Sequence, residues 1–158
     1  MKVPTEAHAD QDGSVERPGF LILRAFFAQF WILQAYGKAH DAKEGTTSLE
    51  NLVHWTSNLT DEFAKSTPLP RFLVAPYAWS APAIELTLGV LLLVGFKTRG
   101  ALLAAAAFLV SLDLGLMFQA DHDSVKSNTI ILLALLWAAR WERWNAFSVD
   151  AWLARRNG

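Results

Sequence analysis

The sequence predicts an all-α integral membrane protein: a four-helix transmembrane bundle with an additional outer amphipathic helix between the first two spans. Two observations predict this fold. The 158-residue chain carries 14 Lys and Arg and 15 Asp and Glu, yet its four apolar stretches contain only Arg24, Glu85 and Asp113. The long stretches are also apolar on every side, whereas a helix on the surface of a soluble protein keeps a polar face. Lipid is therefore the expected surroundings of these helices.

The spans are expected at about residues 18–38, 73–96, 100–120 and 126–143. A hydrocarbon core about 30 Å thick requires roughly 20 mostly apolar residues in a helix, and the first three stretches reach that length. The fourth stretch is shorter, and it reaches the required length when Arg140 extends its side chain to the headgroups. Residues 18–145 thus form the predicted transmembrane domain.

The positions of Lys and Arg predict that both termini are cytoplasmic. The short loop with Lys97 and Arg99 contributes most to this orientation. Residues 1–17 and 146–158 are then cytoplasmic tails. The first seventeen residues are polar and lack the apolar core of a cleavable signal, so the first span is expected to direct the chain to the bacterial inner membrane.

Two further helical patterns concern packing. Apolar residues within 48–65 predict an amphipathic helix on the outer membrane surface, ended by Pro68 and Pro70. In the third span Ala107, Ser111 and Gly115 recur every four residues. Small residues at that spacing allow another helix to approach closely, so this stripe is expected at a helix contact.

Composition excludes several kinds of chemistry. The chain has no cysteine, which excludes a disulfide, a thiolate ligand or a reactive thiol of its own. Its net charge of −1 gives no reason to expect nucleic acid as a partner. The spacing of the four histidines matches no metal-binding signature, so no metal site is expected. Redox chemistry would therefore depend on a bound cofactor or a partner.

The three charged residues within the spans are the candidate catalytic residues: Arg24, Glu85 and Asp113. A charged group near the centre of a bilayer costs on the order of 2.5–3.5 kcal/mol even on insertion scales, so each requires a reason to be there. The expected depths of Arg24 and Glu85 let a long guanidinium reach the carboxylate. Such a pair fits either a polar functional site or a structural ion pair that fixes helix register, and the sequence leaves both open.

Five further residues are candidate ligand-binding residues. Trp31, Gln34 and Lys38 share one sector of the first helix with Arg24, which should face the bundle interior. Asn128 and His122 are expected near the outer surface. Together with the charged residues they predict a polar pocket or relay for a quinone headgroup, a proton or an anion.

The run from Glu85 to Gly100, ELTLGVLLLVGFKTRG, resembles the second-helix signature of the DoxX-like membrane proteins. Shorter pieces also look like their counterparts in that family, and the resemblance covers nearly the whole chain from Pro18. These pieces are the early Arg24, Tyr36-Gly-Lys38, Leu69-Pro70, His122 with Asn128, and Phe147-Ser-Val-Asp150. The resemblance implies a four-helix inner-membrane protein linked to oxidoreductase systems, and a similarity to the DoxD part of archaeal thiosulfate:quinone oxidoreductase.

Two functions follow as hypotheses. In the first, the chain is a membrane subunit of a quinone-dependent oxidoreductase; it binds a quinone, has no intrinsic cofactor and depends on a partner redox protein. In the second, it is a non-catalytic accessory subunit that docks in a larger respiratory or photosynthetic membrane complex. Whether the chain is itself an enzyme, and whether it forms a homo-oligomer, stays open at this point.

Overall fold

The computed structural model describes residues 13–41 and 44–157, and this part of the chain folds into six α-helices, a short 3-10 helix and a two-stranded hairpin. The predicted all-α membrane fold is confirmed. The elements are α2 (Gly13–Ala39), β1 (His40–Asp41), β2 (Thr46–Thr47), α3 (Leu49–Ser66), α4 (Arg71–Val94), α5 (Thr98–Phe118), α6 (His122–Arg140), η1 (Glu142–Trp144) and α7 (Val149–Asn157).

Three helices in the described part of the chain are long and apolar enough to cross a membrane: Val15–Ala39 within α2, and all of α4 and α5. They also expose large apolar side chains, including Ile22 (70%), Leu93 (57%) and Leu114 (58%). Apolar surface of this extent around long helices is typical of contact with lipid. The chain is therefore a multi-pass membrane protein. That α6 also crosses the membrane stays a prediction, because its first two turns are polar.

The helix bounds differ slightly from those expected. Helix α2 begins at Gly13, so Pro18 lies within the helix near its start rather than opening it. Pro18 is the sixth residue of this helix and has no N–H to donate to the carbonyl four residues earlier, so the start of α2 is held by one backbone hydrogen bond fewer. The first twelve residues of the predicted N-terminal tail lie outside the described part. The C-terminal segment, predicted as a tail, contains α7.

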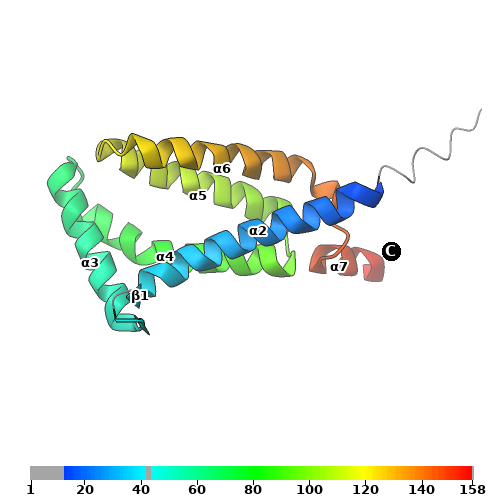
Figure 1. The fold of residues 1–158 in the computed structure, drawn as a ribbon, viewed down its shortest axis with the longest axis horizontal. Helices are drawn as coiled ribbons and strands as arrows, with labels where there is room; N and C mark the ends of the chain where they lie inside the picture. Colours follow the sequence, from blue (N-terminus) through cyan, green and yellow to red (C-terminus); the bar gives the residue numbers. More distant parts are fainter. Residues whose placement is uncertain (1–12, 42–43, 158) are drawn as a thin grey trace, which may run out of the picture.

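The helices form two pairs, α2 with α4 and α5 with α6 (Figure 1). Helix α4 approaches α2 closely at Gly89, where a Cβ atom would lie 2.6 Å from Ile32 Cγ1 and 3.1 Å from the backbone oxygen of Ala28. The core between the pairs is built from large buried side chains such as Phe27, Trp31 and Leu102. Helix α3 lies across one end of the bundle, here named the α3 end, and α7 lies at the opposite, C-terminal end (Figure 1).

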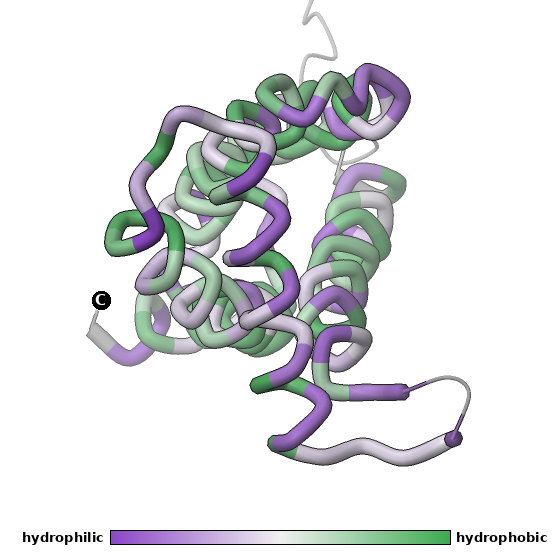
Figure 2. Tube along the Cα trace, turned by 90° about the vertical axis from the view of Figure 1, so that its left-hand side faces the viewer, coloured by the Kyte–Doolittle hydropathy of each residue, from purple (hydrophilic) through white to green (hydrophobic). Residues whose placement is uncertain are grey.

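Helix α3 covers its end of the bundle with a small polar face. Ser48 caps its first turn by accepting a hydrogen bond from the backbone N–H of Asn51 at 3.1 Å. Thr56 and Thr60 are buried, and their hydroxyls donate to backbone carbonyls one turn earlier, so both can face the interior without an unsatisfied group. Seen from this end, the β1–β2 hairpin projects away from the helices (Figure 2).

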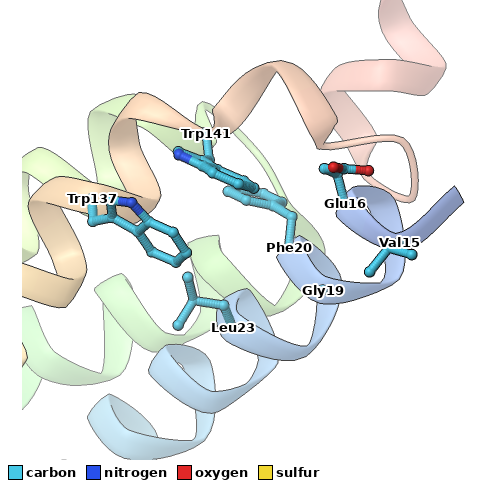
Figure 3. Close-up of a pocket in the computed structure, with 7 residues that line it drawn as sticks. All are labelled: Val15, Glu16, Gly19, Phe20, Leu23, Trp137 and Trp141. Atoms are coloured by element: carbon cyan, nitrogen blue, oxygen red, sulfur yellow. The ribbon is translucent and has the colours of Figure 1, made fainter. Parts of the chain in front are cut away.

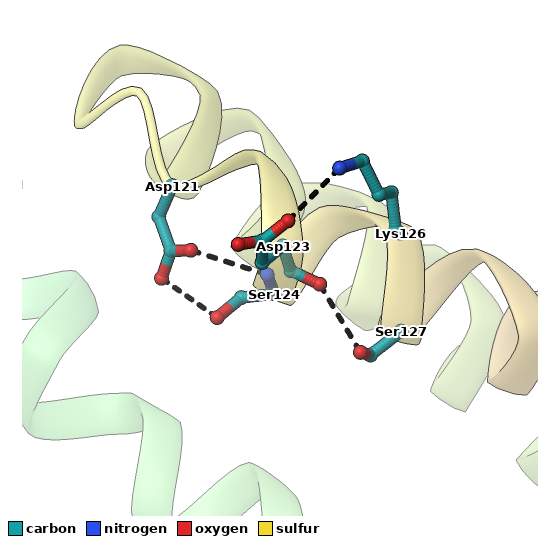
Figure 4. Close-up of polar contacts among 5 residues, drawn as sticks. All are labelled: Asp121, Asp123, Ser124, Lys126 and Ser127. Carbon is teal, nitrogen blue, oxygen red and sulfur yellow. Dashed lines mark hydrogen bonds and ion pairs between the residues drawn. The ribbon is translucent and has the colours of Figure 1, made fainter.

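Helix α6 begins at the α3 end with a set of local polar contacts (Figure 4). Asp121 accepts hydrogen bonds from the backbone N–H and the hydroxyl of Ser124 at 3.1 and 2.6 Å, which lower the pKa of this carboxyl. Asp123 forms an ion pair with Lys126 at 2.9 Å and accepts a hydrogen bond from Ser127 through its backbone oxygen. This cap is typical of a helix N-terminus and fixes where α6 starts.

Candidate functional site

A cavity of about 290 Å³ lies at the α3 end between the two helix pairs, and we name it the α3-end cavity. This volume is near the lower limit of the about 300–1,000 Å³ that small-molecule sites occupy. Five helices contribute to its wall. Its polar lining residues are Gln34 and Lys38 from α2, Tyr77 and Glu85 from α4, and Ser124 and Asn128 from α6.

A buried ion pair is the main electrostatic feature of the cavity. The Lys38 ammonium donates hydrogen bonds to both carboxylate oxygens of Glu85, and the two side chains are only 12% and 2% exposed. Lys38 Nζ also donates to the backbone oxygen of Gln34 at 3.4 Å and lies 5.0 Å from the ring centroid of Trp55. The pair therefore joins α2 to α4 and lies against α3, and its charges are compensated locally.

An aromatic wall lies beside this pair. Trp31 packs against Phe108 with ring centroids 5.7 Å apart, and Phe108 packs against Tyr77 at 6.2 Å. Trp31 is 1% exposed and lines the cavity, and its indole N–H has no hydrogen-bond partner among the described residues. Buried N–H groups are nearly always paired in folded proteins, so this donor is a candidate for binding a ligand oxygen.

Asp113 lies behind the cavity wall. Its carboxylate accepts a hydrogen bond from the side-chain amide of Asn128 at 2.6 Å, and its side chain is buried. Because Asn128 lines the cavity, Asp113 fixes the position of that amide. His122 is exposed at the start of α6 and lies outside the set of described residues that line the cavity.

A second cavity of about 270 Å³ opens between α4 and α5 and is almost entirely apolar. Tyr77 and Leu112 line both this cavity and the α3-end cavity. The Tyr77 hydroxyl is hydrogen bonded to Ser111 at 2.8 Å, which fixes the ring between the two spaces. The polar cavity thus adjoins an apolar one that opens toward the lipid-facing side of α4 and α5.

The expected pairing of Arg24 with Glu85 is wrong. The Arg24 guanidinium donates to the side-chain oxygen of Asn145 and to the backbone oxygen of Phe147, both at 2.6 Å. Both acceptors belong to the C-terminal segment, which the depth estimate from two straight helices could not include. Glu85 is instead reached by Lys38, whose long side chain extends inward from the end of α2.

Asp150 forms a second contact between the C-terminal segment and the bundle. Its carboxylate accepts hydrogen bonds from the backbone N–H groups of Lys97 and Thr98 at 2.7 and 2.8 Å, and from the Thr98 hydroxyl at 3.0 Å. Burial acts to raise the pKa of Asp150, but these hydrogen bonds and the charge of Arg24 outweigh it and lower the pKa. A carboxylate at the start of α5 is also favoured by the helix dipole.

The structure thus brings together five of the predicted site residues, joins a sixth, Asp113, to them through Asn128, and separates two. Trp31, Gln34, Lys38, Glu85 and Asn128 all line the α3-end cavity. Arg24 lies at the C-terminal end, and Asp113 and His122 are placed as described above. The residues missed by the sequence analysis are Trp55, Tyr77 and Ser124.

Each of these three residues has a feature in the sequence that could have indicated it. Trp55 belongs to the amphipathic helix, and Tyr77 carries the one aromatic hydroxyl of the second span. Ser124 follows the Asp-His-Asp turn before the fourth span. None of these signals indicates which element the residue faces, because that depends on how α3 folds across the end of the bundle.

The fold and the cavity define a small multi-pass membrane protein with a polar site buried at one end of its helices. Its family is shown by the match of residues 17–120 to the family model described as methylamine utilisation protein MauE. This match covers more than half of the chain, and the chain belongs to this family. Comparisons with curated proteins and with solved structures give no match.

The resemblance to the DoxX-like proteins is therefore corrected, because the family model that matches is a different membrane family. The pieces that carried it were short and degenerate: a carboxylate before a glycine, a leucine-rich run and a basic turn. Membrane helices in general require such apolar runs and cytoplasmic basic residues, so these features recur without common descent.

Proposed function

We propose that this chain is a membrane accessory subunit of a redox system for methylamine utilisation, and that its α3-end cavity binds a quinone headgroup. The description of its family names methylamine utilisation. Release of nitrogen from methylamine as ammonia is a two-electron oxidation: methylamine, water and quinone give formaldehyde, ammonia and quinol. A quinone is the two-electron, two-proton acceptor that dissolves in the bilayer where this chain lies.

The single observation that carries the proposal is the unpaired Trp31 indole N–H in a cavity that also holds the Lys38–Glu85 ion pair. The indole donates to one carbonyl oxygen of the ligand. Lys38 is a second donor, and Glu85 is the carboxyl group that relays protons to the ligand oxygens as the quinone is reduced to quinol. These groups lie in surroundings of low dielectric constant, where hydrogen bonds and proton affinities are strongly affected by neighbouring charges.

The neighbouring apolar cavity supports a ligand with a hydrocarbon tail. A headgroup in the α3-end cavity would place its tail past Tyr77 and Leu112, which line both spaces. The tail would leave between α4 and α5 toward lipid. A wholly polar ligand would leave this apolar space unfilled, and a wholly apolar one would leave the ion pair and the indole unused.

We assign the chain an accessory role because its family is described by methylamine utilisation and its cavity is a candidate site for the electron acceptor. The electrons come from a partner that oxidises the amine, and this chain holds the acceptor in the membrane. A purely structural role is the second candidate. It is favoured by the saturation of both Glu85 oxygens by Lys38, which by itself would fix α2 against α4.

Binding of a short-tailed quinone, decylubiquinone, to the purified chain tests the proposal. Trp31→Phe keeps an aromatic ring and removes the N–H together with part of the indole, so we expect binding to weaken at least about fivefold, the value of one hydrogen bond of about 1 kcal/mol. Trp152→Phe, at an exposed position in α7, is the matched control and should leave the affinity unchanged. Absence of quinone binding, or equal affinity in both variants, would support the structural role instead.

A further inference from the structure

A second pocket, of about 480 Å³, lies at the C-terminal end of the molecule and gathers three arginines from separate segments. Arg17 comes from α2, Arg143 from η1 and Arg155 from α7. Two carboxylates, Glu142 and Asp150, also line it. The three arginines exceed the two carboxylates by one charge, and the oxygens of Asp150 already accept hydrogen bonds from the start of α5.

An unpaired donor lies in the same wall. Trp144 lines the pocket, and its indole N–H is buried with no hydrogen-bond partner in the described part of the chain. The guanidinium of Arg143 lies 5.1 Å from the centroid of the Trp144 ring. Three guanidinium groups around a single space, with the Trp144 side chain in its wall, are donors suited to the oxygens of a phosphate group.

An apolar groove of about 250 Å³ adjoins this end between α2 and α6 (Figure 3). Phe20 and Leu23 of α2 face Trp137 and Trp141 across it. At two places in the sequence, neighbouring residues line the groove and the arginine pocket. Residues 16 and 141 line the groove, and residues 17 and 142 line the pocket. A ligand with a phosphate head and an acyl chain matches both spaces.

One further group in the groove specifies the headgroup. Glu16 lines it, and one of its carboxylate oxygens is buried with no partner among the residues described. This oxygen requires a donor, which a hydroxyl on the headgroup supplies. A choline headgroup has no such hydroxyl and adds a positive charge beside three arginines.

We propose that the C-terminal end binds an anionic phospholipid with a hydroxylated headgroup, phosphatidylglycerol. Its phosphate lies among Arg17, Arg143, Arg155 and Trp144, its glycerol hydroxyl donates to Glu16, and one acyl chain occupies the groove. The site is independent of the quinone cavity, which lies at the opposite end of the bundle. The bound lipid connects α2, η1 and α7, while Arg24 joins α2 to the segment between η1 and α7.

Titration of short-chain phosphatidylglycerol and phosphatidylcholine into the full chain in a zwitterionic detergent, read by native mass spectrometry, tests the site. We expect preferential binding of phosphatidylglycerol. Each Arg→Gln change at Arg17, Arg143 and Arg155 should weaken it about fivefold, and the triple variant about a hundredfold. The control pair Arg99→Gln and Arg156→Gln removes two exposed cations outside the pocket lining and should leave the affinity unchanged.

Three results would overturn the proposal: equal affinity for the two lipids, an equal loss in the control pair, or displacement of the lipid by millimolar inorganic phosphate, which would indicate a free-phosphate site. Folding of each variant is checked by its helical circular dichroism. If the triple variant fails to fold, Trp144→Phe alone decides. It should weaken phosphatidylglycerol binding several-fold, and unchanged affinity would refute the site.

Discussion

The Lys38–Glu85 ion pair provides a quantitative test of the described helix arrangement. The perturbation is a double-mutant cycle of Glu85→Gln, Lys38→Met and both together. Each single change leaves a charged partner in a site where the two side chains are 2% and 12% exposed, so each should lower the free energy of unfolding by about 3–5 kcal/mol. The double variant leaves no unpaired charge and should lose much less than the sum. The expected coupling energy is about 2–3 kcal/mol.

The assay is reversible unfolding of the purified chain by sodium dodecyl sulfate in mixed micelles, followed by near-ultraviolet circular dichroism. A second cycle pairs Arg24→Met with Glu85→Gln. Because Arg24 is hydrogen bonded to the C-terminal segment, these two changes should be additive within about 0.5 kcal/mol. Additive effects of Lys38 and Glu85, or a larger coupling between Arg24 and Glu85, would show that Glu85 is not paired with Lys38.

Two further predictions concern the C-terminal end. The lowered pKa of Asp150 means that its contribution to docking of the C-terminal segment is complete above the ordinary carboxyl value of 3.8 and is lost as the pH falls through the lowered pKa. Proteolysis of the C-terminal segment by a protease that is active at acid pH should accelerate in that range, and Asp150→Asn should remove the pH dependence; a rate independent of pH in the wild type would contradict this. Gly95→Ala should destabilise the chain by at least about 1–2 kcal/mol, since φ is +68° and a Cβ would meet the Arg24 guanidinium. Gly100→Ala, where nothing lies near the added Cβ, is the control for thermal unfolding and should be neutral or stabilising. Equal losses of stability in both variants would be inconsistent with the left-handed backbone conformation at Gly95.

The sequence was sufficient to predict the features that depend on hydrophobic content and helical period. The apolar spans and the amphipathic helix at 48–65 follow from these patterns, and α3 extends over Leu49–Ser66. Trp31 and Lys38 were placed on one interior sector of the first helix because residues seven apart lie on nearly the same side. Both do line the α3-end cavity.

The features that the sequence could not predict depend on how distant segments return to the bundle. Arg24 finds its acceptors more than 120 positions along the chain, in Asn145 and Phe147. The stripe of small residues is confirmed only in part: Gly115 packs against α3, where an added Cβ would lie 2.7 Å from the Phe63 ring, whereas Ala107 and Ser111 are exposed. The alanines of this helix that pack in the core are Ala101, Ala105 and Ala106. A regular spacing gives the period of a helix face but not the direction in which that face points.

The central claim is that the α3-end cavity holds the quinone that accepts electrons from amine oxidation, and its most direct test is methylamine-dependent quinol formation in native membranes. Rates are expressed per assembled copy of this chain, and Glu62→Gln, at an exposed position in α3, is the control. We expect Glu85→Gln to lower the rate about a hundredfold or more while the control retains it, since a positioned group that transfers protons to the reacting oxygens contributes at least that factor. An unchanged rate per assembled copy in Glu85→Gln would contradict the claim and leave the Lys38–Glu85 pair as a structural contact.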